Sequence, residues 1–482
     1  MQRRIRAWML VLAALAAVGA RHADAEPQPP AAPLEQALLL SDIHFDPLHD
    51  PARAERLFTA PESAWQSILA EPAGPDAAAA FAKLQKSCGA KGVDTPEALL
   101  DSSLAALREH APSARFALVS GDLVVHKLDC RFKTLLPGKS DAEYAAFVAK
   151  TVRYVALRLH AALPGVPVYL ALGNNDSGCG DYELDTDDPF LAATRAAVLD
   201  DLAPPAEHAA ALASYAHAGD YSVRMQGGMR KTRLLVLDDL LQSKKYTGCG
   251  NRPASQAAAA QIAWLRTQLA AARQAGEHVW VMGHIPAGVD PYSTAARLRN
   301  VCAGDQPEMF LSSDALANLM SEYADVITLG IFGHTHMDEM RLFGAEGVPA
   351  ASRIAIKMVA SISPVDGNNP SFLVARVDPV AARLVDYTVF AASNQTGRGT
   401  TWSPEYSYAE SFHEAAFTPA ALGDLLGAFG KDTAAQDASS QAYLQHYFVG
   451  VDGRALSALW PQYVCAMGNY TRQGYAACVC GR

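Results

Sequence analysis

The chain has few charged residues and no dense cluster of basic ones. Of its 482 residues, 19% are charged and 50% are hydrophobic, which is typical of folded proteins and excludes extensive disorder. Its 40 basic and 50 acidic residues give a formal charge of −10. This acidic balance disfavours a nucleic-acid partner. The length suits one large catalytic domain with an appendage, or two domains.

The sequence also lacks an apolar run long enough to span a bilayer comfortably. The N-terminal run, residues 7–20, follows a basic start and precedes the small residues Ala23, Asp24 and Ala25. This order predicts that residues 1–25 are a secretory signal peptide, with a retained membrane anchor as the alternative. We therefore expect an exported protein, periplasmic or secreted, without a stable membrane span.

Cysteine is scarce but even in number. Eight cysteines in an exported chain predict disulfides, and 105 pairings are possible. A zinc site made of thiolates is disfavoured, because the close pair near the C-terminus has no second pair to match it. The cysteines are Cys88, Cys130, Cys179, Cys249, Cys302, Cys465, Cys478 and Cys480.

Short apolar runs that end in polar clusters organise the chain after a Pro- and Ala-rich linker at residues 26–35. Their length and continuous apolarity predict strands buried on both faces. Helix-favouring stretches lie between them, at residues 141–163 and 254–274. The alternation predicts an α/β sheet with its site beyond the carboxyl ends of the strands. The runs are residues 37–40, 116–119, 168–172, 234–237, 279–282 and 326–332.

The second half of the chain follows a different pattern. Strand-like runs at residues 353–360, 372–377 and 384–390 are expected to complete a second sheet. From about residue 396 the pattern becomes helical, and three cysteines lie near the end. We predict a catalytic domain over residues 36–395, and over residues 396–482 a small helical cap that disulfides staple.

Five of the six early runs end in side chains that can bind a metal. Taken singly, each cluster is typical of a turn. Together they supply two carboxylates, four imidazoles and one amide oxygen, a set that suits zinc, manganese or iron. A glycine before a ligand lets the backbone turn sharply off the strand. The pattern predicts a dinuclear metal site formed by Asp42, His44, Asp122, Asn174, His284, His334 and His336.

This ordered set resembles the calcineurin-like metallophosphoesterase superfamily over roughly residues 36–391. It is most similar to the acid sphingomyelinase-like phosphodiesterases, through Gly283-His284-Ile285-Pro286 and the run from Gly333 to Glu339. The resemblance implies an α/β fold with two sheets in a sandwich flanked by helices. It also implies an exported phosphodiesterase in which a hydroxide held between two metals attacks phosphorus in line.

The resemblance further implies a role for each ligand. Asp42, His44 and His336 would hold the first metal, and Asn174, His284 and His334 the second. Asp122 would bridge the two. The metals expected in this branch are zinc, with manganese or iron as alternatives.

One departure from the family concerns the third motif, where Asn175 stands in place of the usual His. An amide can donate a hydrogen bond but cannot deliver a proton at neutral pH. The endopolyphosphatases resemble this chain in carrying Gly-Asn-Asn-Asp, so the change does not imply a dead enzyme. It moves the role of general acid to His126, four residues after Asp122. The alternative is a loop histidine bonded to backbone.

The substrate stays open at this stage. No saposin-like domain is expected in the short stretch before the core, so soluble phosphodiesters are as well supported as sphingomyelin. We expect a small phosphoester or phosphoanhydride, or a phospholipid head group. The alternatives to a phosphodiesterase are a phosphoanhydride hydrolase and a metal-retaining binding protein without turnover.

Several polar and aromatic residues around these motifs are expected to have structural roles. The acidic and imidazole groups of Asp46, His49 and Asp50 are expected in a solvated loop rather than beside the ligands. Asp176 could support the ligands or cap a helix. The aspartates at 238 and 239 are expected to be structural, and the aromatic residues at 402, 406 and 408 to be packed.

Overall fold

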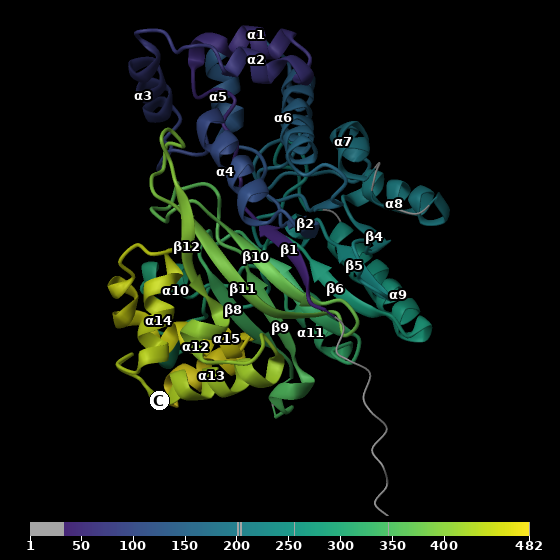
Figure 1. The fold of residues 1–482 in the computed structure, drawn as a ribbon, viewed down its shortest axis with the longest axis vertical. Helices are drawn as coiled ribbons and strands as arrows, with labels where there is room; N and C mark the ends of the chain where they lie inside the picture. Colours follow the sequence, from purple (N-terminus) through teal and green to yellow (C-terminus); the bar gives the residue numbers. More distant parts are fainter. Residues whose placement is uncertain (1–32, 200–201, 203–204, 255, 346, 482) are drawn as a thin grey trace, which may run out of the picture. The chain divides into compact units, whose positions relative to one another are not determined.

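Two mixed sheets of six strands, packed against each other and flanked by helices, form the core (Figure 1). The computed structural model describes residues 33–199, 202, 205–254, 256–345 and 347–481. The predicted signal peptide and nearly all of the linker therefore lie outside the described residues. Phe116 and Trp280 pack edge to face between the two sheets, with ring centroids 5.9 Å apart. The predicted two-sheet α/β fold is confirmed.

The first sheet has a parallel half and an antiparallel half. The early strands β1, β2 and β3 pair in parallel, whereas β10, β11 and β12 add to the other edge of β1 in antiparallel fashion. The strand order is β12-β11-β10-β1-β2-β3. The bounds are β1 Glu35–Leu40, β2 Ala114–Val119, β3 Val168–Leu170, β10 Ser371–Asp378, β11 Arg383–Ala392 and β12 Trp402–Ser407.

The second sheet has a parallel centre and antiparallel edges. Strands β5, β6, β7 and β9 pair in parallel with one another, and the edge strands β4 and β8 pair antiparallel with β5 and β9. The strand order is β4-β5-β6-β7-β9-β8. The bounds are β4 Tyr221–Arg224, β5 Thr232–Val236, β6 His278–Met282, β7 Ile327–Phe332, β8 Glu339–Phe343 and β9 Ile354–Met358.

Helices connect and cover the sheets. Figure 1 shows α1 to α6 gathered at one end of the sheets and α12 to α15 at the other. The predicted helix at residues 141–163 begins with a capping box between Ser140 and Glu143, which satisfies exposed backbone N–H groups. The helices are α1 Ala54–Thr59, α2 Trp65–Leu69, α3 Ala77–Ser87, α4 Glu97–His110, α5 Leu128–Leu135, α6 Asp141–Ala162, α7 Pro189–Leu199, α8 Pro205–Ala218, α9 Ala257–Ala275, α10 Pro291–Ala296, α11 Ala315–Glu322, α12 Tyr408–Phe412, α13 Pro419–Lys431, α14 Ala438–Tyr447, α15 Trp460–Gly468 and α16 Arg472–Cys480.

The placement of the later strands differs from the prediction. All six early runs form strands, but of the three later ones only β9 joins the second sheet, whereas β10 and β11 extend the first. The parallel unit β1-β2-β3 leaves one edge of β1 open, and β10 satisfies the backbone groups of that edge. Apolar periodicity reports burial but not the edge a strand will join.

The C-terminal segment is helical, as predicted, but begins with a strand. Strand β12 pairs with β11, so residues 402–407 belong to the first sheet. The side chains of Trp402, Tyr406 and Tyr408 are at most 9% exposed, which confirms their packing role. Residues 34–482 cluster as one compact unit, and the division at residue 395 stays a prediction.

All eight cysteines are paired, as the sequence predicted for an exported chain. Two disulfides hold the C-terminal helices: Cys465–Cys478 joins α15 to α16, and Cys302–Cys480 ties α16 to the short 3-10 helix Val301–Ala303, 178 residues earlier. The other two are Cys88–Cys130 and Cys179–Cys249. Four disulfides fit export to an oxidising compartment.

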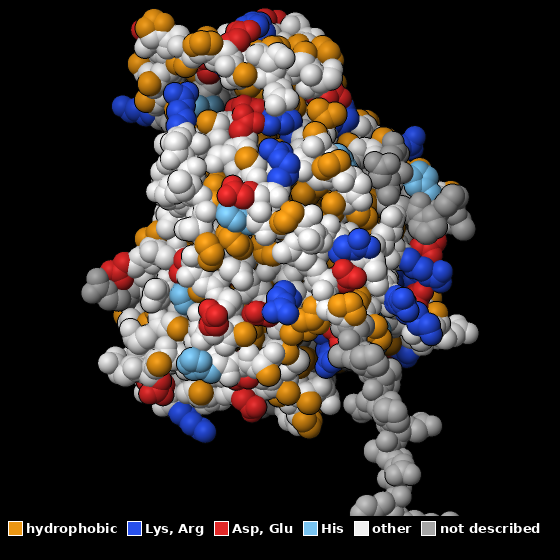
Figure 2. Space-filling view, in the orientation of Figure 1, with side chains coloured by type: hydrophobic (Ala, Val, Ile, Leu, Met, Phe, Trp, Pro, Cys, Tyr) orange, Lys and Arg blue, Asp and Glu red, His pale blue; other side chains and the backbone are white. Residues whose placement is uncertain are grey.

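No helix among the described residues combines the length and apolarity that crossing a membrane requires. On the face shown in Figure 2, Lys and Arg side chains alternate with Asp and Glu and form no continuous basic patch among the described residues.

A buried aspartate beside the second sheet should make stability depend on pH. Asp220 is 3% exposed, and burial, reinforced by Asp239, raises its pKa to about 8. Between about pH 4 and 8 the folded chain keeps this proton and the unfolded chain loses it, so rising pH favours unfolding. Asp220→Asn should gain stability relative to the wild type as pH rises, by no more than about 1.4 kcal/mol per pH unit.

Urea unfolding of both proteins between pH 4 and 8 measures this difference. Asp141→Asn is the matched control, because the side chain of Asp141 is 95% exposed and its replacement should leave a constant difference. A constant difference for Asp220→Asn as well would show that its carboxyl does not control the pH dependence.

Candidate metal centre

The predicted ligands follow five parallel strands at the edge where the carboxyl ends of those strands meet. Asp42 and His44 follow β1, Asp122 follows β2, and Asn174 follows β3. In the second sheet, His284 follows β6, and His334 and His336 follow β7. The two sheets face each other at this edge, so all seven predicted side chains come together.

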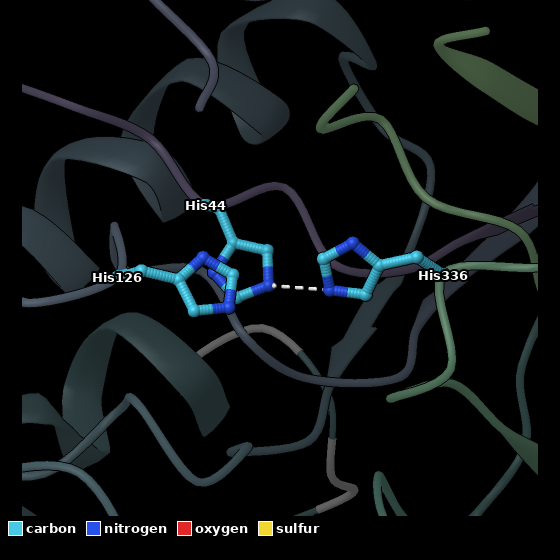
Figure 3. A group of neighbouring side chains, drawn as sticks. All are labelled: His44, His126 and His336. Carbon is cyan, nitrogen blue, oxygen red and sulfur yellow. Dashed lines mark hydrogen bonds between the residues drawn. The ribbon is translucent and has the colours of Figure 1, made fainter. Parts of the chain in front are cut away.

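The first group contains Asp42, His44 and His336. Nε2 of His336 lies 3.3 Å from Oδ1 of Asp42 and 3.1 Å from Nε2 of His44. Figure 3 shows Nε2 of His336 turned toward Nε2 of His44, and the ring of His44 is stacked on that of His126. Two ring nitrogens and a carboxylate oxygen thus converge on one point.

The second group contains Asp122, His284 and His334. Nε2 of His284 lies 3.1 Å from Oδ2 of Asp122 and 3.3 Å from Nδ1 of His334. The same Oδ2 lies 3.5 Å from Nε2 of His44 in the first group. Asp122 therefore stands between the two groups, where a carboxylate shared by two cations would be.

Two buried oxygens at this point have no hydrogen-bond partner among the described residues. They are Oδ1 of Asp42 and Oδ1 of Asn174. The amide of Asn174 is oriented by its Nδ2, which donates to Asp181 at 2.8 Å, so its oxygen faces the cluster. Unpaired buried oxygens are costly unless a cation or water satisfies them. The residues present therefore fit divalent metals.

Outer hydrogen bonds fix which nitrogen faces inward in His44 and in His284. Nδ1 of His44 donates to the carbonyl of Val124 at 2.9 Å, and Nδ1 of His284 donates to the carbonyl of Ser120 at 2.8 Å. These bonds hold a proton on Nδ1, so Nε2 is the nitrogen that faces the cluster and that a cation would engage. Such outer partners are typical of metal-binding histidines.

The backbone is strained at this centre. Asp42, His44, Asp122, His334 and His336 all have positive φ angles, between 44° and 73°, a region that non-glycine residues rarely occupy. Each such residue costs on the order of 1 kcal/mol. The surrounding structure maintains this conformation, and it directs the side chains inward from the ends of the strands.

The glycines before the ligands allow close packing between motifs as well as the predicted sharp turn. Among those at 121, 173, 283 and 333, only Gly121 has a positive φ, of 92°. At Gly333, a Cβ would lie 1.9 Å from Oγ of Ser41 and 2.5 Å from Oδ2 of Asp42. Glycine is therefore required there because the first motif packs directly against the last.

The two aspartates make the centre strongly favourable for positive charge. Burial raises the pKa of Asp122, but His284 and His44 outweigh it and hold the pKa well below the usual value. Burial lowers the pKa of His284, yet Asp122 and Asp42 raise it to about 10. By contrast, burial and the neighbouring His284 lower the pKa of His334 to about 3. Both carboxylates are thus ionised and available to cations.

His126, the predicted general acid, lies beside the first group. Its ring stacks on His44 with centroids 3.9 Å apart, and its side chain is 33% exposed. Nδ1 donates to Oδ1 of Asp94 at 3.0 Å, and Asp94 also accepts from Oγ of Ser363 at 2.9 Å. The sequence analysis missed Asp94, since a lone aspartate before α4 carries no local signal.

Asn175 holds the carboxylate of Asp122. Its Nδ2 donates to Oδ2 of Asp122 at 2.9 Å, and its backbone N–H donates to Oδ1 at 2.8 Å. The residue is buried. The amide at this position thus acts on the orientation of Asp122.

Two further carboxylates hold the ligand loops. Asp176 accepts the backbone N–H groups of Leu123 and Val124 at 3.0 and 2.9 Å, which ties the loop after β3 to the loop after β2. Asp239 accepts the backbone N–H groups of His284 and Ile285, both at 2.9 Å. Asp239 is structural, as predicted, and the structure that it supports is the loop carrying His284.

The expectation of a solvated loop after the first motif was wrong for Asp46. Its side chain is fully buried and lies 2.8 Å from Nη1 of Arg131, itself fully buried. A buried carboxylate needs such a partner. His49, by contrast, is 39% exposed.

A cavity of about 640 Å³ opens onto the centre. Asp122, Asn174, His334 and His336 line its floor together with His126. Its walls carry aromatic and apolar side chains, among them Tyr182, Tyr292, Phe310, Tyr447, Phe448 and Tyr463. This volume suits a small organic molecule.

The family described as calcineurin-like phosphoesterase matches residues 36–338, more than half of the chain. The chain belongs to this family. The match begins at β1 and includes all seven predicted ligands, and it confirms the resemblance drawn from the motifs.

Curated relatives of this phosphoesterase are phosphodiesterases. Sphingomyelinase phosphodiesterase D of Dictyostelium discoideum is 27% identical over 332 residues, which cover 66% of each chain. Acid sphingomyelinase-like phosphodiesterase 3b of Mus musculus is 26% identical over 92% of this chain and 89% of its own. A cyclic GMP-AMP phosphodiesterase of Mus musculus is 24% identical over 80% of this chain and 82% of its own. Family membership and these relatives support a metal-dependent phosphodiesterase.

Proposed function

We propose that this phosphoesterase is an exported phosphodiesterase, periplasmic or secreted, that holds two divalent cations and hydrolyses small phosphodiesters. Asp42, His44 and His336 would hold one cation. Asn174, His284 and His334 would hold the other, and Asp122 would be shared by both. Zinc suits these nitrogen and oxygen donors, and manganese and iron are the alternatives. The convergence of these side chains around two unpaired buried oxygens supports the proposal most directly.

When bound, two such cations acidify water and neutralise charge on the phosphoryl oxygens. The protein's own residues orient the ligands and supply a proton. Because Nδ1 of His126 donates to Asp94, Nε2 is the atom that can donate a proton to the leaving oxygen. Asn175 keeps the carboxylate of Asp122 in place. Its role is therefore positioning rather than proton transfer.

Turnover of bis-p-nitrophenyl phosphate after loading with zinc or manganese tests the proposed function. His284→Ala should abolish this turnover, because it removes an inward nitrogen from the centre. His278→Ala is the matched control, since His278 lies at the opposite end of the same strand, β6, and its replacement should leave turnover unchanged. A protein that binds both metals without hydrolysing any phosphoester or anhydride would instead be the binding protein considered as the alternative.

A phosphoanhydride hydrolase is the second candidate. Asn175 cannot supply a proton, and phosphate leaving groups need that proton less than alkoxides do. Charged residues on the cavity wall bear directly on this alternative.

A further inference from the structure

A lysine and a tyrosine lie on the cavity wall next to the second group of ligands. Nζ of Lys245 donates to Oη of Tyr182 at 3.2 Å and lies 4.4 Å from the centre of the Tyr182 ring. The same Oη lies 3.3 Å from Nε2 of His334. One phenol oxygen therefore connects the lysine to a proposed metal ligand.

The hydrogen bonds of Tyr182 leave its own proton available. His334 directs Nδ1 to the centre, so its Nε2 carries the hydrogen and donates to the phenol oxygen. Lys245 donates to the same oxygen, which therefore accepts twice. The phenol hydrogen and the remaining ammonium hydrogens can then be donated to an oxygen of a bound molecule.

Lys245 forms no ion pair with a carboxylate among the described residues, unlike its neighbour. Lys244 pairs with Glu308 at 2.9 Å. The carboxylates near Lys245 are engaged elsewhere: Asp181 accepts from Asn174, and Asp290 caps α10 through Ser293. Burial lowers the pKa of Lys245, with Lys244 and Lys91 adding to the effect. The lysine thus places a cation in the cavity that a bound anion would stabilise.

A disulfide joins the two loops that carry this pair. Cys179 and Cys249 are bonded, three residues before Tyr182 and four residues after Lys245. The backbone carbonyl of Tyr182 also accepts a hydrogen bond from the N–H of Thr247 in the Lys245 loop, at 3.1 Å. The pair is therefore preorganised, which lowers the cost of ordering it around a ligand.

The position of one cation on this wall distinguishes between classes of phosphodiester. Lysines and carboxylates both line the cavity, so it is the local ammonium of Lys245, which has no carboxylate partner among the described residues, and not the net charge of the wall, that favours an anion. A quaternary ammonium group, as in a phosphocholine ester, would meet a like charge directly beside Lys245. A second phosphate next to the scissile one would gain charge-assisted hydrogen bonds there.

Building on the proposed function, we propose that Lys245, held by Tyr182, binds a second phosphate next to the scissile one, so that diphosphate diesters are the preferred substrates. Hydrolysis adds one water across the P–O–P bridge. The water oxygen bonds to one phosphorus, the bond from that phosphorus to the bridging oxygen breaks, and two phosphate monoester dianions leave with release of both protons of the water. The departing phosphate is stable as an anion, in keeping with the absence of a proton donor at Asn175.

Two substrates that differ by one phosphate test this proposal: P1,P2-diphenyl diphosphate and diphenyl phosphate. The measured quantity is the ratio of their kcat/KM values for the metal-loaded full chain. When this ratio is compared between wild type and variant, the difference in intrinsic reactivity between the two substrates cancels. Lys245→Gln should lower the ratio about 10- to 100-fold, as expected for a charged hydrogen bond. Lys245→Arg should retain most of it, and Lys244→Gln should leave it unchanged.

Binding provides a readout that does not depend on turnover. Calorimetry on the metal-loaded protein gives the affinities for methylenediphosphonate and for inorganic phosphate, and Lys245→Gln should lower their ratio by a similar factor. Ratios that Lys245→Gln leaves unchanged would overturn the role of Lys245. If the wild type hydrolyses neither substrate, the proposed function fails, and the binding ratio still decides whether Lys245 recognises a second phosphate.

Discussion

Replacing Asp122 by Asn is expected to lower turnover of bis-p-nitrophenyl phosphate by on the order of a thousandfold or more. Its Oδ2 lies 3.1 Å from Nε2 of His284 and 3.5 Å from Nε2 of His44, so it serves both ligand groups. The substitution keeps the shape but removes the negative charge between them. Both carboxylate oxygens of Asp122 accept hydrogen bonds from Asn175, so the NH2 group of the new amide would face one of these two donors. Both effects weaken cation binding.

Metal content gives an independent measure of this effect. Wild-type protein should bind two equivalents of zinc by atomic absorption after dialysis, and Asp122→Asn should bind fewer. Asp290→Asn is the matched control, because Asp290 lines the same cavity and caps α10, a task that Asn also performs. If Asp122→Asn kept both metals and full turnover, a shared carboxylate at this position would be refuted.

Replacing His126 by Ala is expected to slow the hydrolysis of diphenyl phosphate about 100-fold. The same change should slow the hydrolysis of bis-p-nitrophenyl phosphate much less, because p-nitrophenolate leaves readily without a proton. The ring of His126 lies at the cavity, with Nδ1 held by Asp94, so its Nε2 can reach a leaving oxygen. The comparison of the two kcat values separates proton donation from a general loss of structure.

The control for His126 comes from the first ligand loop. His49 is 39% exposed and packs against Phe81, so His49→Ala should slow neither substrate. Equal slowing of both substrates by His126→Ala would count against the acid role. It would instead indicate that His126 supports His44 by stacking.

The sequence predicted much of the centre because each ligand follows a strand. Apolar runs of strand length identify buried parallel strands, and the site of such a sheet lies beyond their carboxyl ends. The side chains of Asp42, Asp122 and His284 could therefore be assigned to one edge before any contact was known. The same argument placed Asn174 and the two histidines after β7. Their ordered spacing also carried the resemblance that the family match confirmed.

Contacts between distant segments could not be predicted in this way. Asp94 and His126 are 32 residues apart, and nothing in the local pattern pairs one loop aspartate with one loop histidine. The same holds for Lys245 and Tyr182, 63 residues apart. A lone polar residue in a loop is compatible with many partners, and only the fold selects one.

By itself, the sequence determined the early strands, the chemistry of the seven side chains and their common edge, because strand periodicity and ligand type are local properties. The tertiary structure decided which edges β10, β11 and β12 join, which cysteines pair, and which outer groups orient the centre. Those choices depend on how surfaces far apart in the chain pack together, as at Gly333, where the last motif meets Asp42 too closely for any side chain.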